Sequence, residues 1–422
     1  MRDTATRSGR PVGSAVPVDG DPTSRPRPIA SAPASAQTAA KPSAAVAGRD
    51  GARHLGPMNA EHLVADEIAR ARTLPSAEYH DPGSYARQCE RVFARAWHLL
   101  PGAAEVRAPG HVRPFTLLPG CLDEPLVLSR GADGELRCLS NVCTHRGALV
   151  VEGEGHLRGF RCRYHGRKFG LDGCFQSMPE FEGVEAFPSA DDDLPRLALA
   201  RWGPLTFAAL HPAFPFEEWI GPVRERVDWL RPEEWRLDPA TSRDYVLDAH
   251  WALYVDNYLE EFHIPYVHGA SLAGAMDYQG YHTVRFELGN LQVGAASGGQ
   301  PTLELPAGHP EAGQRTGALY FWLFPNLMLN VYPWGLSLNV VEPLGPRRTR
   351  VRFLSYVADP TLRGSGLGGD LHRVEMEDEE IVESVQAGVR SRLYDRGRYS
   401  PRREVGTHHF HVLLQRFLEA GD

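Results

Sequence analysis

Long apolar runs and an excess of basic charge are both missing from this sequence. None of its 422 residues falls in a stretch approaching the ~18 consecutive apolar residues that a membrane-spanning helix needs. The 45 Lys and Arg residues are outnumbered by 53 Asp and Glu residues, which leaves a net charge of −8. Nucleic acids and anionic membranes select basic surfaces, so we expect neither as a partner.

Cysteine is also scarce, with six residues in the whole chain. The sequence shows no apolar leader of the kind that directs proteins to oxidising compartments, so we expect a cytoplasmic protein without a disulfide framework. In such a protein, cysteines spaced close to histidines indicate a metal site.

The first 58 residues contain no Phe, Trp or Tyr, and 32 of them are Ala, Pro, Gly or Ser. Such a segment buries too little apolar surface to offset its ordering entropy, so we expect residues 1–58 to be a disordered low-complexity tail. The segment is basic and poor in acids, as an organelle transit peptide is, but it lacks an amphipathic pattern. The tail is therefore the favoured interpretation.

The residue pattern of the remaining chain changes twice. Helical patterns at 59–73 and 82–97 predict a helical segment over 59–100 that packs on the C-terminal domain. Short runs broken by glycine predict antiparallel β structure over 101–215, with a hairpin turn at the ADG of 132–134. Residues 216–422 mix aromatic and β-branched runs with helices near 371–394 and 407–420, which predicts an α+β domain with helices on one antiparallel sheet.

Two of the six cysteines stand beside histidines. The stretches NVCTHRGALV (141–150) and FRCRYHGRKF (160–169) contain Cys143-x-His145 and, sixteen residues later, Cys162-x-x-His165. Tetrahedral zinc accepts two cysteines and two histidines, usually opening on a C-x(2–4)-C pair. A Rieske-type [2Fe–2S] cluster binds one iron through two cysteines and the other through two histidines. Mixed pairs favour the cluster, because each loop then sends one ligand to each iron.

A second constellation lies in HWALYVDNYLEEFHIPYVHG (250–269), which contains Asn257, Glu260, His263 and His268. Apolar residues at helical spacing predict an amphipathic helix up to residue 262. Two histidines five residues apart on a regular helix point about 140° apart, so they meet at one ion only if Pro265 kinks the helix. Two histidines and a carboxylate suit a mononuclear non-heme iron. In isolation, histidines in a helix more often pack or face solvent.

The carboxylate ligand is expected downstream. In HRVEMEDEEIVESVQAGVRSRLY (372–394), Asp378 falls inside the apolar stripe, four residues after Val374 and four before Val382. A carboxylate on a buried face is costly unless it is paired or coordinates a metal. Asp378 is therefore the predicted third ligand, with Glu379 as the runner-up. Glu377 and Glu379 are otherwise expected to be solvated charges.

These motifs together resemble those of the ring-hydroxylating (Rieske non-heme iron) oxygenase α subunits. The family has C-x-H-R-G followed by C-x-Y-H-G, and N-x-x-(D/E)-x-x-H-x(4)-H; the chain matches both, although Arg167 stands where many members have Trp. The resemblance spans about residues 73–420. It implies a β-rich Rieske domain over 101–215 and a helix-grip, START-like catalytic domain over 216–422.

The resemblance also implies the role of each residue. The expected [2Fe–2S] ligands are Cys143, His145, Cys162 and His165, and the expected ligands of one Fe(II) are His263, His268 and Asp378. Asn257 falls on the family's asparagine. Glu260 falls on its bridging carboxylate, which links a Rieske histidine of the neighbouring subunit to an iron-binding histidine.

The implied function is that of a terminal oxygenase component, which uses O₂ and electrons from an NAD(P)H-dependent reductase or ferredoxin and assembles as a homotrimer or a multiple of three. We favour an aromatic substrate. The alternative is a quaternary ammonium or N-methyl compound, because residues 321–346 resemble a segment of choline-monooxygenase-like α subunits. Four aromatic residues here offer rings for a cationic substrate, although sheet core is the simpler role for each: Tyr320, Trp322, Tyr332 and Trp334. A Rieske electron carrier or a zinc protein would need no second metal site.

Overall fold

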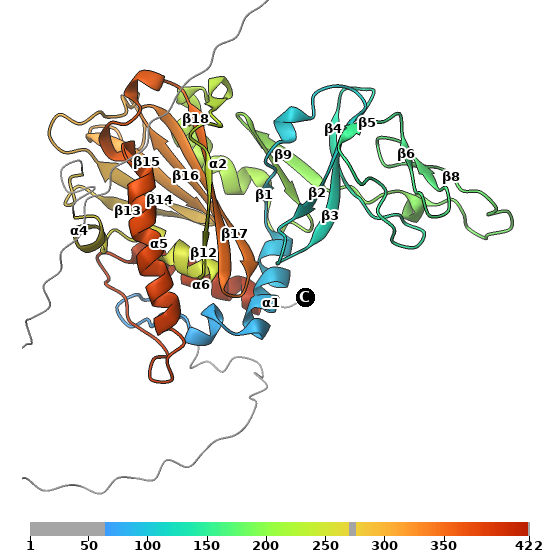
Figure 1. Ribbon diagram of the computed structural model, residues 1–422. Helices are drawn as coiled ribbons and strands as arrows, with labels where there is room; N and C mark the ends of the chain where they lie inside the picture. The colour runs from blue at the N-terminus through green and yellow to red at the C-terminus, as the bar shows by residue number, and fades with distance from the viewer. Residues whose placement is uncertain (1–63, 270–275, 421–422) are drawn as a thin grey trace, which may run out of the picture. The chain divides into compact units, whose positions relative to one another are not determined.

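The computed structural model of the chain describes residues 64–269 and 276–420 (Figure 1). The predicted tail over 1–58 lies outside these residues. In the part of the chain that the structure describes, no helix is both long enough and apolar enough to cross a membrane.

The β-rich part consists of small antiparallel sheets. One four-stranded sheet has the order β4-β3-β2-β5, with β2 (His111–Leu117), β3 (Glu124–Arg130), β4 (Leu136–Ser140) and β5 (Gly155–His156). A three-stranded sheet follows, made of β6 (Phe160–Arg161), β7 (Lys168–Phe169) and β8 (Phe175–Ser177). The predicted ADG hairpin is confirmed, since Gly134 N donates to Gly131 O between β3 and β4. The two Cys/His stretches follow β4 and separate β6 from β7.

A third small sheet joins residues far apart in the sequence. Strand β1 (His98–Leu99) pairs with β10 (Leu205–Ala209), which pairs with β9 (Ala198–Trp202). The end of the segment predicted as helical, 59–100, therefore forms a strand that pairs near the end of the predicted β-rich domain, 101–215.

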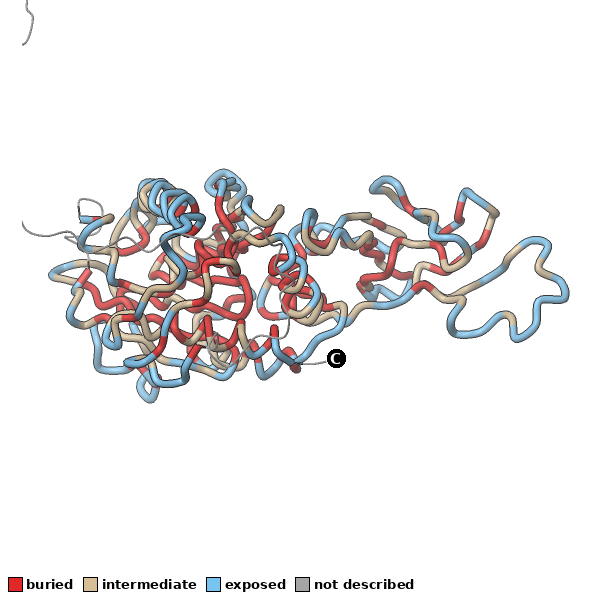
Figure 2. The backbone as a smooth tube through the Cα atoms, turned by 90° about the horizontal axis from the view of Figure 1, so that it is seen from below, coloured by how far each residue is buried: buried red, intermediate tan, exposed pale blue. Residues whose placement is uncertain are grey.

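The C-terminal part is built on one large antiparallel sheet with the order β11-β18-β17-β16-β15-β14-β13, in which β12 also pairs with β18 (Figure 1). Its strands are β11 (Arg236–Leu237), β12 (Arg243–Leu247), β13 (His282–Phe286), β14 (Gly289–Ala295), β15 (Thr316–Leu323), β16 (Leu327–Tyr332), β17 (Gly335–Gly345) and β18 (Arg348–Val357). The first nine residues of β17 are all buried, so both faces of the sheet are covered there. Figure 2 shows buried residues, in red, gathered in the interior of this part of the protein.

Helices cover this sheet, as the α+β prediction requires. The described α-helices of the chain are α1 (Pro82–Arg91), α2 (Phe216–Val227), α3 (Trp251–Tyr258), α4 (Ile264–Val267), α5 (Leu371–Gly388) and α6 (Val405–Glu419). Helix α3 contacts β17, α5 and α6, and α6 contacts β13 and β14. Figure 1 shows α5 running across the strands. The α+β prediction is confirmed, as is the helix predicted near 407–420.

The prediction of a helix over 59–73 is wrong for its described part, 64–73. A single turn forms there, and Arg72 instead bridges Arg398 while Thr73 N donates to Gly397 O. Starting a helix is costly, so pairing with a distant segment prevails over a short helical pattern. The second predicted helix forms as α1, which begins after the N-cap Asp81 and ends at Arg91 instead of near 97. Its Gln88 side chain accepts a hydrogen bond from Trp251 Nε1 of α3 at 2.8 Å.

Candidate metal centres and substrate cavity

The two Cys/His loops have the same backbone construction. In the first loop, Gly147 N donates to Cys143 O at 3.0 Å, and in the second loop Gly166 N donates to Cys162 O at 3.0 Å. Both glycines have left-handed φ angles, 72° and 78°, which residues with a Cβ rarely adopt. Each loop therefore turns sharply after its cysteine and presents the ligand residues on one side.

The side chains of the two loops fit a shared metal cluster. Cys143 and Cys162 are buried, and the rings of His145 and His165 lie 4.7 Å apart. His165 Nδ1 is buried and makes no hydrogen bond within the described residues. A buried ring nitrogen without a partner is rare in a folded protein and fits a metal ligand. Burial also raises the pKa of the Cys143 thiol, so its thiolate needs a positive partner such as iron.

Arg167, where the resembling family often has Trp, is part of the packing of the second loop. Its side chain is 2% exposed and forms an ion pair with Asp192. Its guanidinium carbon lies 4.9 Å from the centre of the Phe175 ring and 5.6 Å from that of Phe187. Stacking on aromatic faces is typical of arginine, and here it packs Arg167 among the aromatic rings of this loop region.

The predicted helix up to residue 262 is wrong: α3 ends at Tyr258. Leu259 caps it, a turn covers 260–263, and the short α4 begins at Ile264. The break therefore precedes Pro265, which lies in the first turn of α4, where its missing N–H has no partner to lose. Glu260 stabilises the turn, because its Oε2 accepts hydrogen bonds from the backbone N–H groups of Phe262 and His263.

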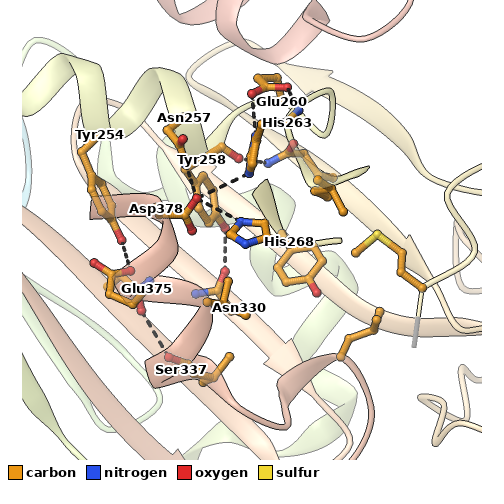
Figure 3. Close-up of a pocket in the computed structure, with 18 of the residues that line it drawn as sticks. Tyr254, Asn257, Tyr258, Glu260, His263, His268, Asn330, Ser337, Glu375 and Asp378 are labelled. Atoms are coloured by element: carbon orange, nitrogen blue, oxygen red, sulfur yellow. Dashed lines mark hydrogen bonds and ion pairs between the residues drawn. The ribbon is translucent and has the colours of Figure 1, made fainter. Parts of the chain in front are cut away.

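This turn brings the three predicted iron ligands together. One ligand atom each from His263, His268 and Asp378 lies within 4.8 Å of the others. His268 Nε2 is 3.0 Å and His263 Nε2 is 3.5 Å from Asp378 Oδ1. Figure 3 shows both rings converging on this carboxylate. Two imidazoles and one carboxylate on one side of a site are the donor set of mononuclear non-heme iron.

The outer nitrogens of both rings meet carboxylates. His263 Nδ1 is 2.6 Å from Glu260 Oε1, and His268 Nδ1 is 2.8 Å from Glu377 Oε2. With each Nδ1 proton shared with a carboxylate, the ring tautomer places the lone pair on Nε2, which is the nitrogen that would bind a metal beside Asp378. Burial lowers the pKa of His268, but its hydrogen bonds to Asp378 and Glu377 outweigh burial and raise it.

The prediction that Glu377 is a solvated charge is wrong. Its side chain is 23% exposed, contacts His268, and accepts a hydrogen bond from Arg373 Nε at 3.1 Å. The pattern along α5 did not reveal this role, because the partner histidine lies 109 positions away in the sequence. Glu379, the runner-up ligand, is not part of the cluster, whereas Asn257 Nδ2 donates to Asp378 Oδ1 at 2.7 Å.

The stripe predicted on α5 is confirmed only in part. Val382 and Val389 are buried, but Ile381 and Val385 are 38% and 42% exposed, and the helix ends at Gly388 instead of near 394. Glu375 is buried on the face that carries Asp378.

A cavity opens beside the cluster. Six aromatic rings line it: Tyr254, Tyr258, Tyr281, Tyr320, Tyr332 and Phe353. Of the four aromatics predicted for a cationic substrate, Tyr320 and Tyr332 line the cavity. Trp322 instead packs on Phe410 of α6, with ring centres 5.3 Å apart, and the Trp334 ring lies 5.1 Å from the guanidinium carbon of Arg363.

Two family models match this chain. The Rieske [2Fe-2S] domain matches residues 96–188, and the ring hydroxylating alpha subunit (catalytic domain) matches residues 227–420. The chain belongs to the Rieske non-heme iron oxygenases as an α subunit, which makes it an oxidoreductase. Its cofactors are a Rieske [2Fe–2S] cluster and a mononuclear iron. These matches exclude a zinc-binding protein and a Rieske-only electron carrier.

Curated relatives agree with this family. The chain is 32% identical over 370 residues to the chloroplastic choline monooxygenase of Arabidopsis thaliana, covering 83% of this chain and 84% of that protein. It is 30% identical over 362 residues to the carnitine monooxygenase oxygenase subunit of Escherichia coli (strain K12), covering 82% and 93%.

Two solved structures share the fold. One is the quaternary ammonium Rieske monooxygenase CntA in complex with L-carnitine, with a TM-score of 0.64, 23% identity, and coverage of 83% of this chain and 98% of that one. The other is naphthalene 1,2-dioxygenase from Rhodococcus sp. bound to indole, with a TM-score of 0.64, 21% identity, and coverage of 83% and 95%.

Proposed function

We propose that this α subunit is the terminal oxygenase of a monooxygenase system acting on a small quaternary ammonium or N-methyl substrate of the choline or betaine type. This replaces the aromatic substrate favoured from the sequence. The observation that carries the proposal is the cavity lining: six aromatic rings and three carboxylates, Glu260, Glu375 and Asp378, with no Lys or Arg among the described lining residues.

The lining suits a cation better than an aromatic hydrocarbon. A quaternary ammonium ion is attracted to the faces of tyrosine rings and to carboxylates, and it has no N–H groups to satisfy. An apolar substrate would leave the buried Oε1 of Glu375, which has no hydrogen-bond partner among the described residues, without any polar interaction. The curated relatives named choline and carnitine monooxygenases support the same choice.

We assign the cofactor ligands as the sequence predicts. The assigned [2Fe–2S] ligands are Cys143, His145, Cys162 and His165, and the assigned iron ligands are His263, His268 and Asp378. When bound, the two centres supply the electron transfer and O₂ activation that the family's chemistry requires. The protein's part is to position ligands: Glu260 and Glu377 hold the two ring Nδ1 protons, and Asn257 orients the Asp378 carboxylate.

We further propose a homotrimer in which Glu260 faces the Rieske domain of a neighbouring subunit. Glu260 is followed by two exposed aromatic residues, Phe262 at 44% and Tyr266 at 80% exposure. Exposed aromatic side chains beside a functional carboxylate are typical of a surface that a partner covers. A solved CntA structure is described as giving insights into inter-subunit electron transfer in that enzyme. The reductase or ferredoxin donor and the cytoplasmic location stay predictions.

The test has two parts. Anaerobically purified protein is expected to hold about three irons and two acid-labile sulfides per chain, and His263→Ala about two irons with unchanged sulfide. With a surrogate reductase, O₂ consumption is then compared for choline, L-carnitine and naphthalene. Product formation from a quaternary ammonium compound supports the proposal, and turnover of naphthalene alone would overturn it.

A further inference from the structure

One buried carboxylate in the cavity has no role in holding the metal ligands. Glu375 lies on α5, three residues before Asp378, and its side chain is 3% exposed. It lines the same cavity as His263, His268 and Asp378 (Figure 3). It contributes no atom to the three-residue cluster and makes no hydrogen bond to either histidine within the described residues.

The two oxygens of Glu375 differ in their partners. Tyr254 Oη donates to Oε2 at 2.7 Å, which anchors one side of the carboxylate to α3. Oε1 is buried and has no hydrogen-bond partner among the described residues. A buried carboxylate oxygen left without a partner is costly, so such a group in a cavity wall indicates that a ligand supplies the missing interaction.

The charges around the cavity define what that ligand is. Glu260 and Asp378 are engaged with His263, His268 and Asn257, so Glu375 is the lining carboxylate that remains for the substrate. No described lining residue is Lys or Arg. The described cavity wall therefore offers a carboxylate for a positive charge and a hydroxyl, and no Lys or Arg side chain to pair with a negative charge.

We propose that Glu375, anchored by Tyr254, is a specificity-determining residue that admits quaternary ammonium alcohols and rejects quaternary ammonium compounds that carry a carboxylate. This inference rests on the proposed function and narrows it. A bound cation keeps the Glu375 carboxylate ionised, and its unpartnered Oε1 accepts a hydrogen bond from the substrate hydroxyl. A substrate carboxylate in the same cavity meets like charge and no basic side chain, which weakens binding.

The experiment measures dissociation constants by calorimetry on the full-length, metal-loaded protein, with choline and glycine betaine as probes. The wild type is expected to bind choline at least about tenfold more tightly than glycine betaine. Glu375→Gln is expected to weaken choline binding about tenfold or more and to bring the two constants close together. Glu380→Gln makes the same chemical change at an exposed position of α5 and is expected to leave both constants unchanged.

A wild-type preference for choline that persists in Glu375→Gln would overturn the role of Glu375 while leaving the proposed function standing. A wild type that binds neither probe but binds naphthalene would instead overturn the proposed function.

If Glu375→Gln does not fold, Tyr254→Phe and Glu375→Asp take its place. Tyr254→Phe removes only the anchor and is expected to weaken choline binding several-fold, whereas Glu375→Asp keeps the charge and the preference. Unchanged choline binding in Tyr254→Phe, or a lost preference in Glu375→Asp, would contradict the proposal.

Discussion

At the scale of single residues, the iron site combines three proposed ligands with three side chains that orient them. Glu260, Glu377 and Asn257 each contact a different proposed ligand, at 2.6 to 2.8 Å. Such outer contacts fix the tautomer of a ligand histidine and the direction of a ligand carboxylate. The geometry of the site therefore depends on residues that would not bind the metal.

The residue-scale prediction concerns Glu377. Glu377→Gln should lower the affinity of the mononuclear site for Fe(II) about 10- to 100-fold, because the carboxylate that accepts the Nδ1 proton of His268 is lost. The measurement is an Fe(II) titration of protein whose mononuclear site has been emptied. Acid-labile sulfide should stay at about two per chain, since the cluster is untouched. Equal Fe(II) affinity in the variant and the wild type would show that the contact of Glu377 with His268 does not support metal binding.

At the scale of elements, the break between α3 and α4 decides whether two histidines five residues apart can meet. The break is made by the end of α3 and by hydrogen bonds to Glu260, with Pro265 already inside α4. Pro265→Ala should therefore leave iron content unchanged and lower the free energy of unfolding by only about 0.5–1 kcal/mol, through greater freedom of the unfolded chain. Iron analysis and urea unfolding check this. Loss of the mononuclear iron would mean that proline itself makes the break.

The beginning of α3 predicts a pH dependence. His250 is buried and caps the helix by accepting a hydrogen bond from Ala252 N at 3.2 Å, and burial lowers its pKa to about 3. Because the folded-state pKa lies below the ordinary value of about 6.5, its stabilising contribution is present above that value and is lost as the pH falls towards 3. Between pH 7 and pH 5 this one group should cost about 2 kcal/mol of stability.

His250→Asn provides the matching control. Asparagine keeps a side-chain cap but has no group that titrates in this range, so the variant should lose about that much of the pH dependence. Urea unfolding at pH 7 and pH 5 measures the difference. An identical pH dependence in the two proteins would assign the effect to other buried histidines.

At the scale of the whole molecule, the proposed trimer predicts that a substitution at the subunit interface lowers turnover without lowering metal content. Tyr266→Glu places a charge on the exposed aromatic surface next to Glu260. Burying this charge when the subunits associate is unfavourable, so the substitution should weaken trimer association about tenfold or more. Iron and sulfide content should stay at wild-type values while turnover falls with dilution. Analytical ultracentrifugation combined with metal analysis tests this. A wild type that is monomeric and fully active would overturn the assembly.

The sequence alone was enough to identify the family and both cofactors and to predict the seven proposed ligand positions, because metal ligation imposes residue types at fixed short spacings. It also indicated the α+β class, α6 and the β3–β4 hairpin, since these follow from patterns and turns within a few residues of each other.

Only the tertiary structure decided which residues support those ligands and which face the substrate. Glu377 meets His268, and Glu375 meets Tyr254, across more than 100 positions in the sequence, so no local pattern marks either one. In the same way, Tyr320 and Tyr332 line the cavity while Trp322 packs on α6, because the position of α6 over the sheet determines which rings it covers. Spacing within a segment follows from local chain geometry, whereas contacts between segments exist only once helices and sheet have packed together.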